Sequence, residues 1–273
     1  MDNVIDGRKL AAIHEQRLID KLRHLNFRPK IVSILVGDDE ASLTYTKMKQ
    51  KKAAEVGIDF DYIKFPETEQ FQNVAMTIVK LNQDPRINGI MVQLPLPGEF
   101  LRERTTDDLL GRIDPQKDVD GLRVDSPFLP ATVRGVISIL EDENVEVAGK
   151  FFAVLGKGQL VGKPIAKELK KRGALIGVID SKTPNTADIT RRADVIISAV
   201  GKPNLVTGEM VKEGVVVIDV GITRLDNGRL VGDVDFGSVS QKASKITPVP
   251  GGVGPMTVVS LMENVVESAE RRE

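Results

Sequence analysis

Three glycines follow a short apolar segment near the middle of the chain, and their spacing suits the binding of a phosphate group. Gly156, Gly158 and Gly162 form a GxGxxxG pattern, one residue longer than the usual dinucleotide fingerprint. Glycines let the backbone approach a pyrophosphate, and a helix that starts here, with Pro164 in its first turn, offers free N–H groups. Asp180 closes the next apolar segment, where an acid that binds a ribose is expected. The pattern therefore predicts a dinucleotide site.

The same turn allows two other interpretations. It could pack a helix against a sheet and bind nothing, because such glycine patterns often mislead. A phosphate-binding loop of the NTPase type fits poorly, because the segment GQLVGKP has one residue too few between its glycines. Pro164 also stands where that loop needs the serine or threonine that binds magnesium.

The composition narrows the chemistry that these 273 residues can perform. The absence of cysteine excludes disulfides, cysteine nucleophiles, iron–sulfur clusters and thiolate zinc sites. The only two histidines, His14 and His24, disfavour a histidine metal site or a Ser-His-Asp triad, so we expect no metal. With 38 basic and 39 acidic residues, the chain lacks the charge of a nucleic-acid binder. Catalysis must then use Lys, Tyr, Asp, Gln and a bound cofactor.

The hydropathy pattern predicts neither a membrane segment nor a secretion signal. No apolar run approaches the ~18 residues of a membrane span. The opening MDNVIDGRKL is too charged for a signal peptide. We therefore expect a cytoplasmic protein with no membrane partner.

The elements that must position these residues alternate between helix and strand in both halves of the chain. In the first half, apolar spacing predicts helices at 6–25, 41–56 and 71–82 and strands at 31–36, 60–65 and 90–94. A break rich in Pro, Gly and Asp follows, and from Phe151 a run of βα units continues to residue 220. This order predicts an α/β fold with two α/β domains, the second a Rossmann-like doubly wound parallel sheet, and an active-site cleft between them.

Five segments, read together, go beyond a general fold argument. They are VGDDEASLTYTKMKQKKAAEVGI (36–58), VQLPLP (92–97), PQKDVDGL (115–122), GKGQLVGKP (156–164) and PVPGGVGPMT (248–257). In this order they resemble the methylenetetrahydrofolate dehydrogenase/methenyltetrahydrofolate cyclohydrolase family. The resemblance implies oxidation of 5,10-methylenetetrahydrofolate to 5,10-methenyltetrahydrofolate with NADP, and then hydrolysis to 10-formyltetrahydrofolate. It also implies a folate-binding catalytic domain of residues 1–130 plus 252–273 and an NAD(P)-binding domain of 131–251.

The resemblance assigns four residues to catalysis. Lys49 matches the family's central catalytic lysine, and Tyr45 is its partner four residues earlier, a spacing that places both on one helix face. Gln93 matches the glutamine that hydrogen-bonds this lysine. Asp120 matches the acid that holds the pterin ring, so it binds substrate as Tyr45 does. The alternatives are a solvated basic helix face for the lysine and an ordinary polar strand end for Gln93.

The loop PVPGGVGP would close over the folate, with Pro250, Gly251 and Gly252 as its substrate contacts. Its prolines limit the freedom of the loop and its glycines admit the ligand. The chain departs from the usual family sequence nearby, because the segment between Asp120 and Pro130 is short and the following P-C-T-P-x-G stretch lacks its cysteine and second proline. Neither departure removes a catalytic residue.

The residues around the glycine turn give opposing indications of the cofactor preference. The resemblance implies cofactor contacts at Gly156, Lys157, Gly158, Ser181, Lys182 and Ile222. Asp180 favours NAD, because an acid at this position accepts from the ribose 2′-hydroxyl and repels a 2′-phosphate. Lys157 replaces the family's arginine, and a second lysine and a serine stand beside Asp180, which favours a phosphate if that acid points away. We expect NADP, with NAD possible because of Asp180.

Two rival functions remain at this stage. One is another two-domain NAD(P)-dependent dehydrogenase, of the shikimate or amino-acid type, with a different substrate lysine. The other is a non-catalytic protein that binds a nucleotide. The family resemblance further implies a homodimer formed through the cofactor half.

Overall fold

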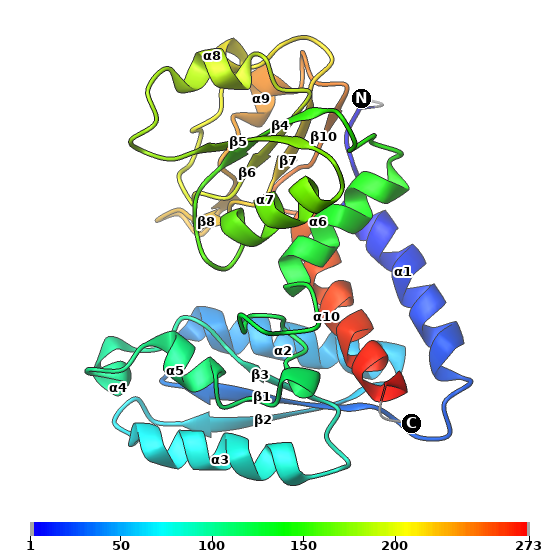
Figure 1. The fold of residues 1–273 in the computed structure, drawn as a ribbon, viewed down its shortest axis with the longest axis vertical. Coiled ribbons are helices and arrows are strands. Elements are labelled where there is room, and N and C mark those ends of the chain that lie inside the picture. Colours follow the sequence, from blue (N-terminus) through cyan, green and yellow to red (C-terminus); the bar gives the residue numbers. More distant parts are fainter. Residues whose placement is uncertain (1–2, 272–273) are drawn as a thin grey trace. The chain divides into compact units, whose positions relative to one another are not determined.

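The structure, a computed structural model, describes residues 3–271 and consists of two compact units. Unit 1 is made of Met1–Ala12 and Thr132–Thr257, and unit 2 of Ile13–Ala131 and Val258–Glu273. Each unit contains a parallel sheet with helices packed on it (Figure 1). The prediction of two α/β domains is confirmed.

Unit 2 is built on a three-stranded parallel sheet in the order β2-β1-β3. Its strands are β1 (Lys30–Val36), β2 (Asp59–Phe65) and β3 (Gly89–Val92), and its main helices are α2 (Glu40–Val56) and α3 (Phe71–Gln83). The two helices cover opposite faces of the sheet (Figure 1). Asp39 caps α2 by accepting from the Ser42 N–H at 2.7 Å, and Gly57 ends it with a φ of +97°.

Side chains of β1 alternate between these two faces because successive residues of a strand point to opposite sides. Val32 and Ile34 pack in the core with α3, whereas Ile31 packs in the core with α2. Ser33 pairs in register with Met91 of β3, so both share the face that α2 covers. This face holds the candidate site.

Unit 1 is built on a five-stranded parallel sheet in the order β10-β7-β6-β4-β5. Its strands are β4 (Phe151–Leu155), β5 (Leu175–Ile179), β6 (Val195–Ser198), β7 (Val216–Asp219) and β10 (Lys245–Ile246). Its helices include α7 (Gly162–Lys171), α8 (Thr186–Thr190) and α9 (Phe236–Val239), and a short hairpin joins β8 (Thr223–Arg224) to β9 (Leu230–Val231). The chain reverses direction across the sheet between β4 and β6, as expected of a doubly wound sheet, so the Rossmann-like prediction is confirmed.

Three longer helices include residues of both units. They are α1 (Gly7–Leu22), α6 (Ala131–Asp142) and α10 (Val253–Glu270). The proline-rich break is more ordered than expected, because it contains α4 (Gly98–Leu101), α5 (Thr106–Leu110) and the 3₁₀ turn η1 (Pro115–Lys117). Helix α5 starts with a capping box between Thr105 and Asp108.

The N-terminal segment pairs with the last strand of unit 1. Val4 forms a parallel bridge with Ile246, and the Ile5 N–H donates to the Ile246 carbonyl at 2.8 Å. The Ile246 N–H donates in turn to the carbonyl of Asn3 at 2.9 Å. These bonds cover the β10 edge of the sheet. Within residues 3–271, no helix has the length and apolar character needed to cross a membrane.

Candidate active site

Lys49 lies on the buried face of α2, where a charged side chain needs a specific reason to be. It is only 5% exposed, and its Nζ donates to Oε1 of Gln93 at 3.1 Å and lies 3.8 Å from the sulfur of Met91. The ring of Tyr45, one helical turn away, has its centroid 4.8 Å from the same nitrogen. The packing of α2 on the sheet therefore aims one amine at the carboxyl end of β3.

Gln93 follows β3 directly and continues its pairing with β1. Its backbone N–H donates to the carbonyl of Ile34 at 2.9 Å, which fixes the position of the residue. Its side-chain nitrogen donates to the Leu94 carbonyl at 2.8 Å, so the amide oxygen must face Lys49. The glutamine is therefore an oriented acceptor for the lysine.

Asp120 lies on the loop after η1, and its carboxylate interacts electrostatically with Lys49. Burial lowers the pKa of Lys49, and the negative charge of Asp120 opposes that shift. Burial likewise raises the pKa of Asp120, and the positive charge of Lys49 opposes it. The two groups thus stabilise each other's charged forms in a desolvated setting.

Tyr45 has a different electrostatic character. Burial, with a further contribution from the Asp120 charge, raises its pKa to about 12. Its phenol therefore stays protonated at neutral pH, so Tyr45 offers a neutral ring and hydroxyl. Unit 2 brings together all four predicted catalytic residues, with one amine suited to proton transfer and one acid suited to binding a planar heterocycle.

The glycine turn lies in unit 1, where β4 leads into α7. Gly156 has a φ of +105°, and a Cβ there would lie 2.4 Å from the carbonyl oxygen of Ala199, directly after β6. A Cβ on Gly162 would lie 2.0 Å from the Gly156 carbonyl oxygen, so the turn closes tightly onto the start of α7. Around a Cβ on Gly158, by contrast, no described residue other than its two chain neighbours comes within 4 Å. The turn therefore combines close packing with one open backbone position at the reversal point of the sheet.

Asp180 points toward Lys157 and not away from it, which is the reverse of the orientation on which the expectation of NADP depended. Its Oδ2 lies 2.5 Å from Nζ of Lys157, and its Oδ1 accepts from the Lys182 N–H at 3.0 Å and the Thr183 hydroxyl at 2.9 Å. These bonds, that to Lys157 first, lower the pKa of Asp180 to about 2. Lys157 thus neutralises Asp180, while Ser181 and Lys182 are exposed beside it.

Three exposed apolar side chains lie near the carboxyl ends of the strands of unit 1. Ile222, which follows β7, was predicted, but Leu160 in the glycine turn and Val200 after β6 were not. Exposed apolar residues at this edge of a parallel sheet are typical of a ligand-binding site. The available signal was that Val200 follows a continuous apolar strand directly.

The loop with Pro250, Gly251 and Gly252 also belongs to unit 1, where it contacts the start of α1. A Cβ on Gly7 would lie 1.8 Å from the Gly252 carbonyl oxygen, and Gly251 has a φ of +108°. Pro250 is exposed, whereas Gly252 is buried. Sequence reasoning missed this close contact of Gly7, although a glycine in the first turn of the helix expected at 6–25 was a usable signal.

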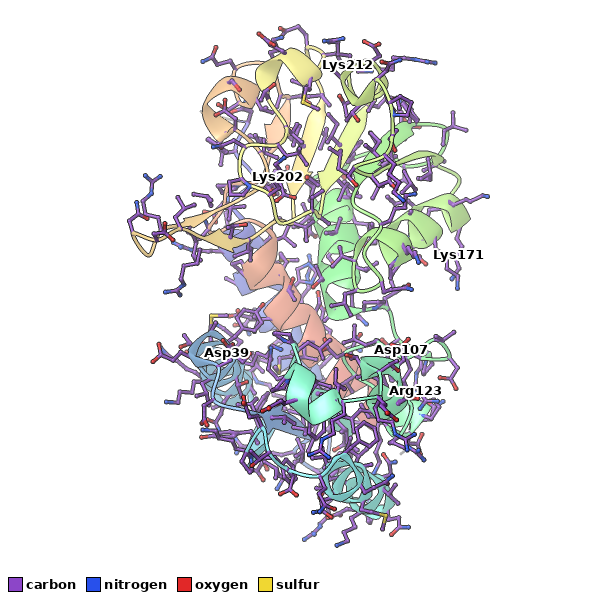
Figure 2. The ribbon with its side chains drawn as sticks, turned by 90° about the vertical axis from the view of Figure 1, so that its left-hand side faces the viewer. Asp39, Asp107, Arg123, Lys171, Lys202 and Lys212 are labelled. Atoms are coloured by element: carbon purple, nitrogen blue, oxygen red, sulfur yellow. The ribbon has the colours of Figure 1, made fainter. Side chains whose placement is uncertain are left out.

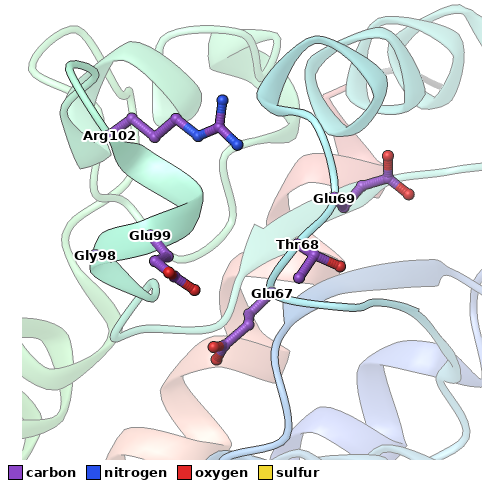
Figure 3. A pocket seen from close by; sticks show the side chains of 6 residues that line it. All are labelled: Glu67, Thr68, Glu69, Gly98, Glu99 and Arg102. Atoms are coloured by element: carbon purple, nitrogen blue, oxygen red, sulfur yellow. The ribbon is translucent and has the colours of Figure 1, made fainter.

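A separate cavity of about 400 Å³ lies elsewhere in unit 2. It is lined by Glu67, Thr68, Glu69, Gly98, Glu99 and Arg102 (Figure 3). None of the predicted site residues lines it, and its excess of negative charge would repel an anionic ligand. We assign no ligand to it. Over residues 3–271, the acidic and histidine side chains form no group that could hold a metal ion.

Comparison with known proteins decides the family. The model for the tetrahydrofolate dehydrogenase/cyclohydrolase catalytic domain matches residues 5–120, and that for the NAD(P)-binding domain of the same family matches residues 130–273. The chain belongs to the tetrahydrofolate dehydrogenase/cyclohydrolase family. The resemblance carried by the five sequence segments is thereby confirmed.

Individual members of this family are similar over nearly the whole chain. The bifunctional protein FolD of Nautilia profundicola is 43% identical, over 98% of this chain and 97% of its own length. The crystal structure of the Campylobacter jejuni bifunctional enzyme FolD has a TM-score of 0.94 at 41% identity and covers 99% of both chains. The Trypanosoma brucei enzyme, complexed with NADP and an inhibitor, has a TM-score of 0.91 at 35% identity, over 98% of this chain and 97% of its own.

Proposed function

We propose that this family member oxidises 5,10-methylenetetrahydrofolate to 5,10-methenyltetrahydrofolate with NADP, and then hydrolyses the product to 10-formyltetrahydrofolate. The observation that carries the proposal is the desolvated Lys49, bonded to Gln93 and electrostatically coupled to Asp120 in the unit that matches the family's catalytic domain. Neither a different two-domain dehydrogenase nor a non-catalytic nucleotide binder accounts for this grouping.

Each residue has a distinct role in binding the folate. Asp120 holds the pterin ring through charge-assisted hydrogen bonds to its amino group and ring nitrogen. Tyr45 offers its neutral ring to the aromatic part of the folate. The loop of Pro250, Gly251 and Gly252 adds substrate contacts. We assign folate binding to residues 1–130 plus 252–273 and cofactor binding to 131–251.

The oxidation requires mainly orientation from the protein. A bound nicotinamide supplies a hydride acceptor, and the lone pairs of N5 and N10 stabilise the cation left on the one-carbon bridge. Asp120 and Tyr45 hold the folate in one orientation, which replaces a bimolecular encounter by a positioned one. The lowered pKa of Lys49 reduces the positive charge beside the cation as it forms.

The hydrolysis requires proton transfer, which we assign to Lys49. The neutral amine takes one proton from the water that attacks the methenyl carbon, and the ammonium so formed gives it to N5 as the carbon–N5 bond breaks. The second proton of that water leaves the hydroxyl group for solvent as the formyl C=O forms, which balances the positive charge of the methenyl substrate. Burial favours the neutral amine before the reaction, and the cationic substrate favours it further. Gln93 accepts a hydrogen bond from Lys49 in both protonation states of the amine. This bond keeps the Lys49 nitrogen directed at the reacting carbon.

The turn residues of unit 1 fit an adenine dinucleotide. Gly158 leaves room for the pyrophosphate, and α7 begins directly behind the turn. Lys157, Ser181 and Lys182 provide two cations and a hydroxyl for a 2′-phosphate, while Lys157 also neutralises the one nearby acid. We therefore assign NADP rather than NAD.

An absorbance assay for methenyltetrahydrofolate tests the function. Purified protein with methylenetetrahydrofolate and NADP should form the methenyl compound, and added methenyltetrahydrofolate should disappear as 10-formyltetrahydrofolate forms. A protein that binds NADP but performs neither reaction would overturn the proposal.

We further propose that the enzyme is a cytoplasmic homodimer joined through unit 1. The support is the outer strand β5, where Leu175 is 61% exposed and Val178 39% exposed on a sheet edge that no further strand within residues 3–271 pairs with. Apolar side chains on an open strand edge favour association. Leu175→Lys should convert the species seen by analytical ultracentrifugation from dimer to monomer; a monomeric unmodified protein would refute the assignment.

A further inference from the structure

The loop that carries Asp120 is closed by its own backbone. Gly121 has a φ of +69°, and a Cβ there would lie 2.6 Å from the carbonyl oxygen of Leu129. The Ala131 N–H donates to the carbonyl of Asp120 at 3.2 Å. The loop 118–131 therefore returns to its starting point, with Asp120 where the two ends meet.

Arg123 ties this loop to the segment that follows α5. Its Nη1 donates to the carbonyl oxygens of Gly111 at 2.5 Å and Ile113 at 2.7 Å. Its Nε and Nη2 donate to the two oxygens of Asp125, each at 2.8 Å. Its backbone N–H donates to Oδ2 of Asp118 at 2.9 Å. This side chain, labelled in Figure 2, is 13% exposed. Nearly all of the five N–H donors of its planar guanidinium are therefore engaged in hydrogen bonds within the protein.

Helix α10 holds the same loop from within unit 2. Nδ2 of Asn264 donates to the carbonyl oxygens of Val119 at 2.8 Å and Leu129 at 3.0 Å, so one amide joins both ends of the loop. One turn later, the Ser268 hydroxyl lies 2.7 Å from the carbonyl oxygen of Gln116. Polar residues four apart thus form a line on a helix that is otherwise largely apolar.

We propose that Arg123, together with Asn264, is a positioning residue for folate: it orders the loop 118–131 so that the Asp120 carboxylate faces Lys49 and the pterin ring. The inference rests on the folate role proposed above for Asp120. If the loop is already ordered before folate arrives, folate binding does not have to reduce the conformational entropy of the loop, so the affinity is higher. Arg123 suits this task because lysine could not reproduce its four side-chain bonds.

The first test is Arg123→Lys, which keeps the positive charge and removes the planar set of guanidinium donors. The KM for methylenetetrahydrofolate should rise about tenfold or more, the loss expected for hydrogen bonds to a charged group. The KM for NADP should stay unchanged and kcat should change less than the folate KM. Arg86→Lys is the matched control, because Arg86 makes the same two bonds, at 2.9 and 2.6 Å, to Asp84 two residues away but is 85% exposed.

A double-mutant cycle separates positioning from a general structural effect. Calorimetric titration with tetrahydrofolate compares Arg123→Lys in the unmodified protein and in Asp120→Asn. If Arg123 acts through Asp120, its effect should fall to less than about twofold in the Asp120→Asn background. An undiminished effect there would overturn the inference. A wild-type protein that binds no tetrahydrofolate would instead refute the proposed function.

Asp125→Asn keeps the inference testable if Arg123→Lys does not fold. Asp125 is 61% exposed and its carboxylate accepts from the Arg123 guanidinium, so the fold should tolerate the change at this exposed ion pair. The folate KM should rise by about two- to fivefold with an unchanged KM for NADP. An unchanged folate KM would contradict the role of Arg123.

Discussion

The side-chain nitrogen of Lys49 lies 3.1 Å from the amide oxygen of Gln93, whose own nitrogen is bonded to the Leu94 backbone at 2.8 Å. The glutamine cannot turn without breaking one of these bonds. It therefore presents a neutral acceptor to a lysine whose pKa is already lowered by burial.

Gln93→Glu should replace this neutral acceptor by a negative charge. A carboxylate favours the ammonium, so the pKa of Lys49 should rise and the neutral fraction at a given pH should fall. The pH at which cyclohydrolase kcat is half-maximal should move up by about 1–3 units, the usual effect of an adjacent opposite charge. Gln70→Glu, on an exposed residue of the same unit, should leave the profile in place. A profile that stays fixed in Gln93→Glu would exclude Lys49 as the titrating group.

Lys49→Met should remove cyclohydrolase activity, because the change deletes the amine and roughly keeps the volume. We expect kcat to fall by about 10²–10⁴ while the affinity for the dinucleotide is near normal. Lys47→Met, an exposed position on the same helix, is the matched control and should retain full activity. Substantial ring opening by the purified Lys49→Met protein would contradict the assignment.

Asp120→Asn should weaken folate far more than the cofactor. Loss of a charge-assisted contact should raise the folate KM about tenfold or more. Because the Asp120 charge raises the pKa of Lys49, its removal should also move the cyclohydrolase pH profile to lower pH, opposite to Gln93→Glu. Equal losses for folate and NADP would mean that Asp120 acts through folding.

Lys157→Ala should weaken NADP much more than NAD. The change removes a cation that we assign to the 2′-phosphate, and it leaves the Asp180 carboxylate unneutralised so that it repels that phosphate. NAD has no 2′-phosphate, and its ribose 2′-hydroxyl can donate to the freed carboxylate. The ratio of kcat/KM values for the two cofactors measures this. Lys171→Ala, at the far end of α7 and labelled in Figure 2, should not change the ratio. An unmodified enzyme that uses NAD at least as well as NADP would overturn the assignment.

Thr46→Val should be neutral or stabilise the protein by up to about 1 kcal/mol, because the buried Thr46 hydroxyl has no hydrogen-bond partner among residues 3–271. Thr247→Val is the matched contrast: its equally buried hydroxyl accepts from the Asp219 N–H at 2.7 Å. Thr247→Val leaves the Asp219 N–H without this acceptor, which should lower the free energy of unfolding by about 1–3 kcal/mol. Urea unfolding of both variants compares them, and a larger loss for Thr46→Val would show that its hydroxyl is bonded after all.

Regular elements were predictable because their apolar spacing is local. The segment 31–36 was expected as a strand, and β1 covers Lys30–Val36; α3 spans Phe71–Gln83 where 71–82 was expected. The short helices α4 and α5 were missed because five residues or fewer give too little periodicity, although the Thr105–Asp108 capping box was visible. The run of βα units expected from Phe151 to residue 220 is regular except between β6 and β7, where the segment GEMVKE forms only the 3₁₀ turn η2 (Gly208–Met210) and no α-helix.

The residues of the candidate site also fall into those that the sequence predicts and those that it does not. Lys49 and Tyr45 were predictable because residues four apart share a helix face, and the family motif supplied their roles. The joint role of Arg123 and Asn264 was not predictable from the sequence. These two residues are 141 positions apart, and both act through hydrogen bonds to backbone carbonyl oxygens, which leave no pattern in the sequence. The pairing of Lys157 with Asp180 was missed as well, since a sequence gives charges but not their directions.

The coverage of β10 by residues 3–5 has a consequence for the homodimer proposed above. Residues 4 and 5 occupy one side of the five-stranded sheet, so among residues 3–271 the edge at β5 is the one left without a partner strand. Two copies joined symmetrically at β5 would use up both free edges. Growth by strand addition would then stop at a pair, and the N-terminal segment would act as a terminator of polymerisation.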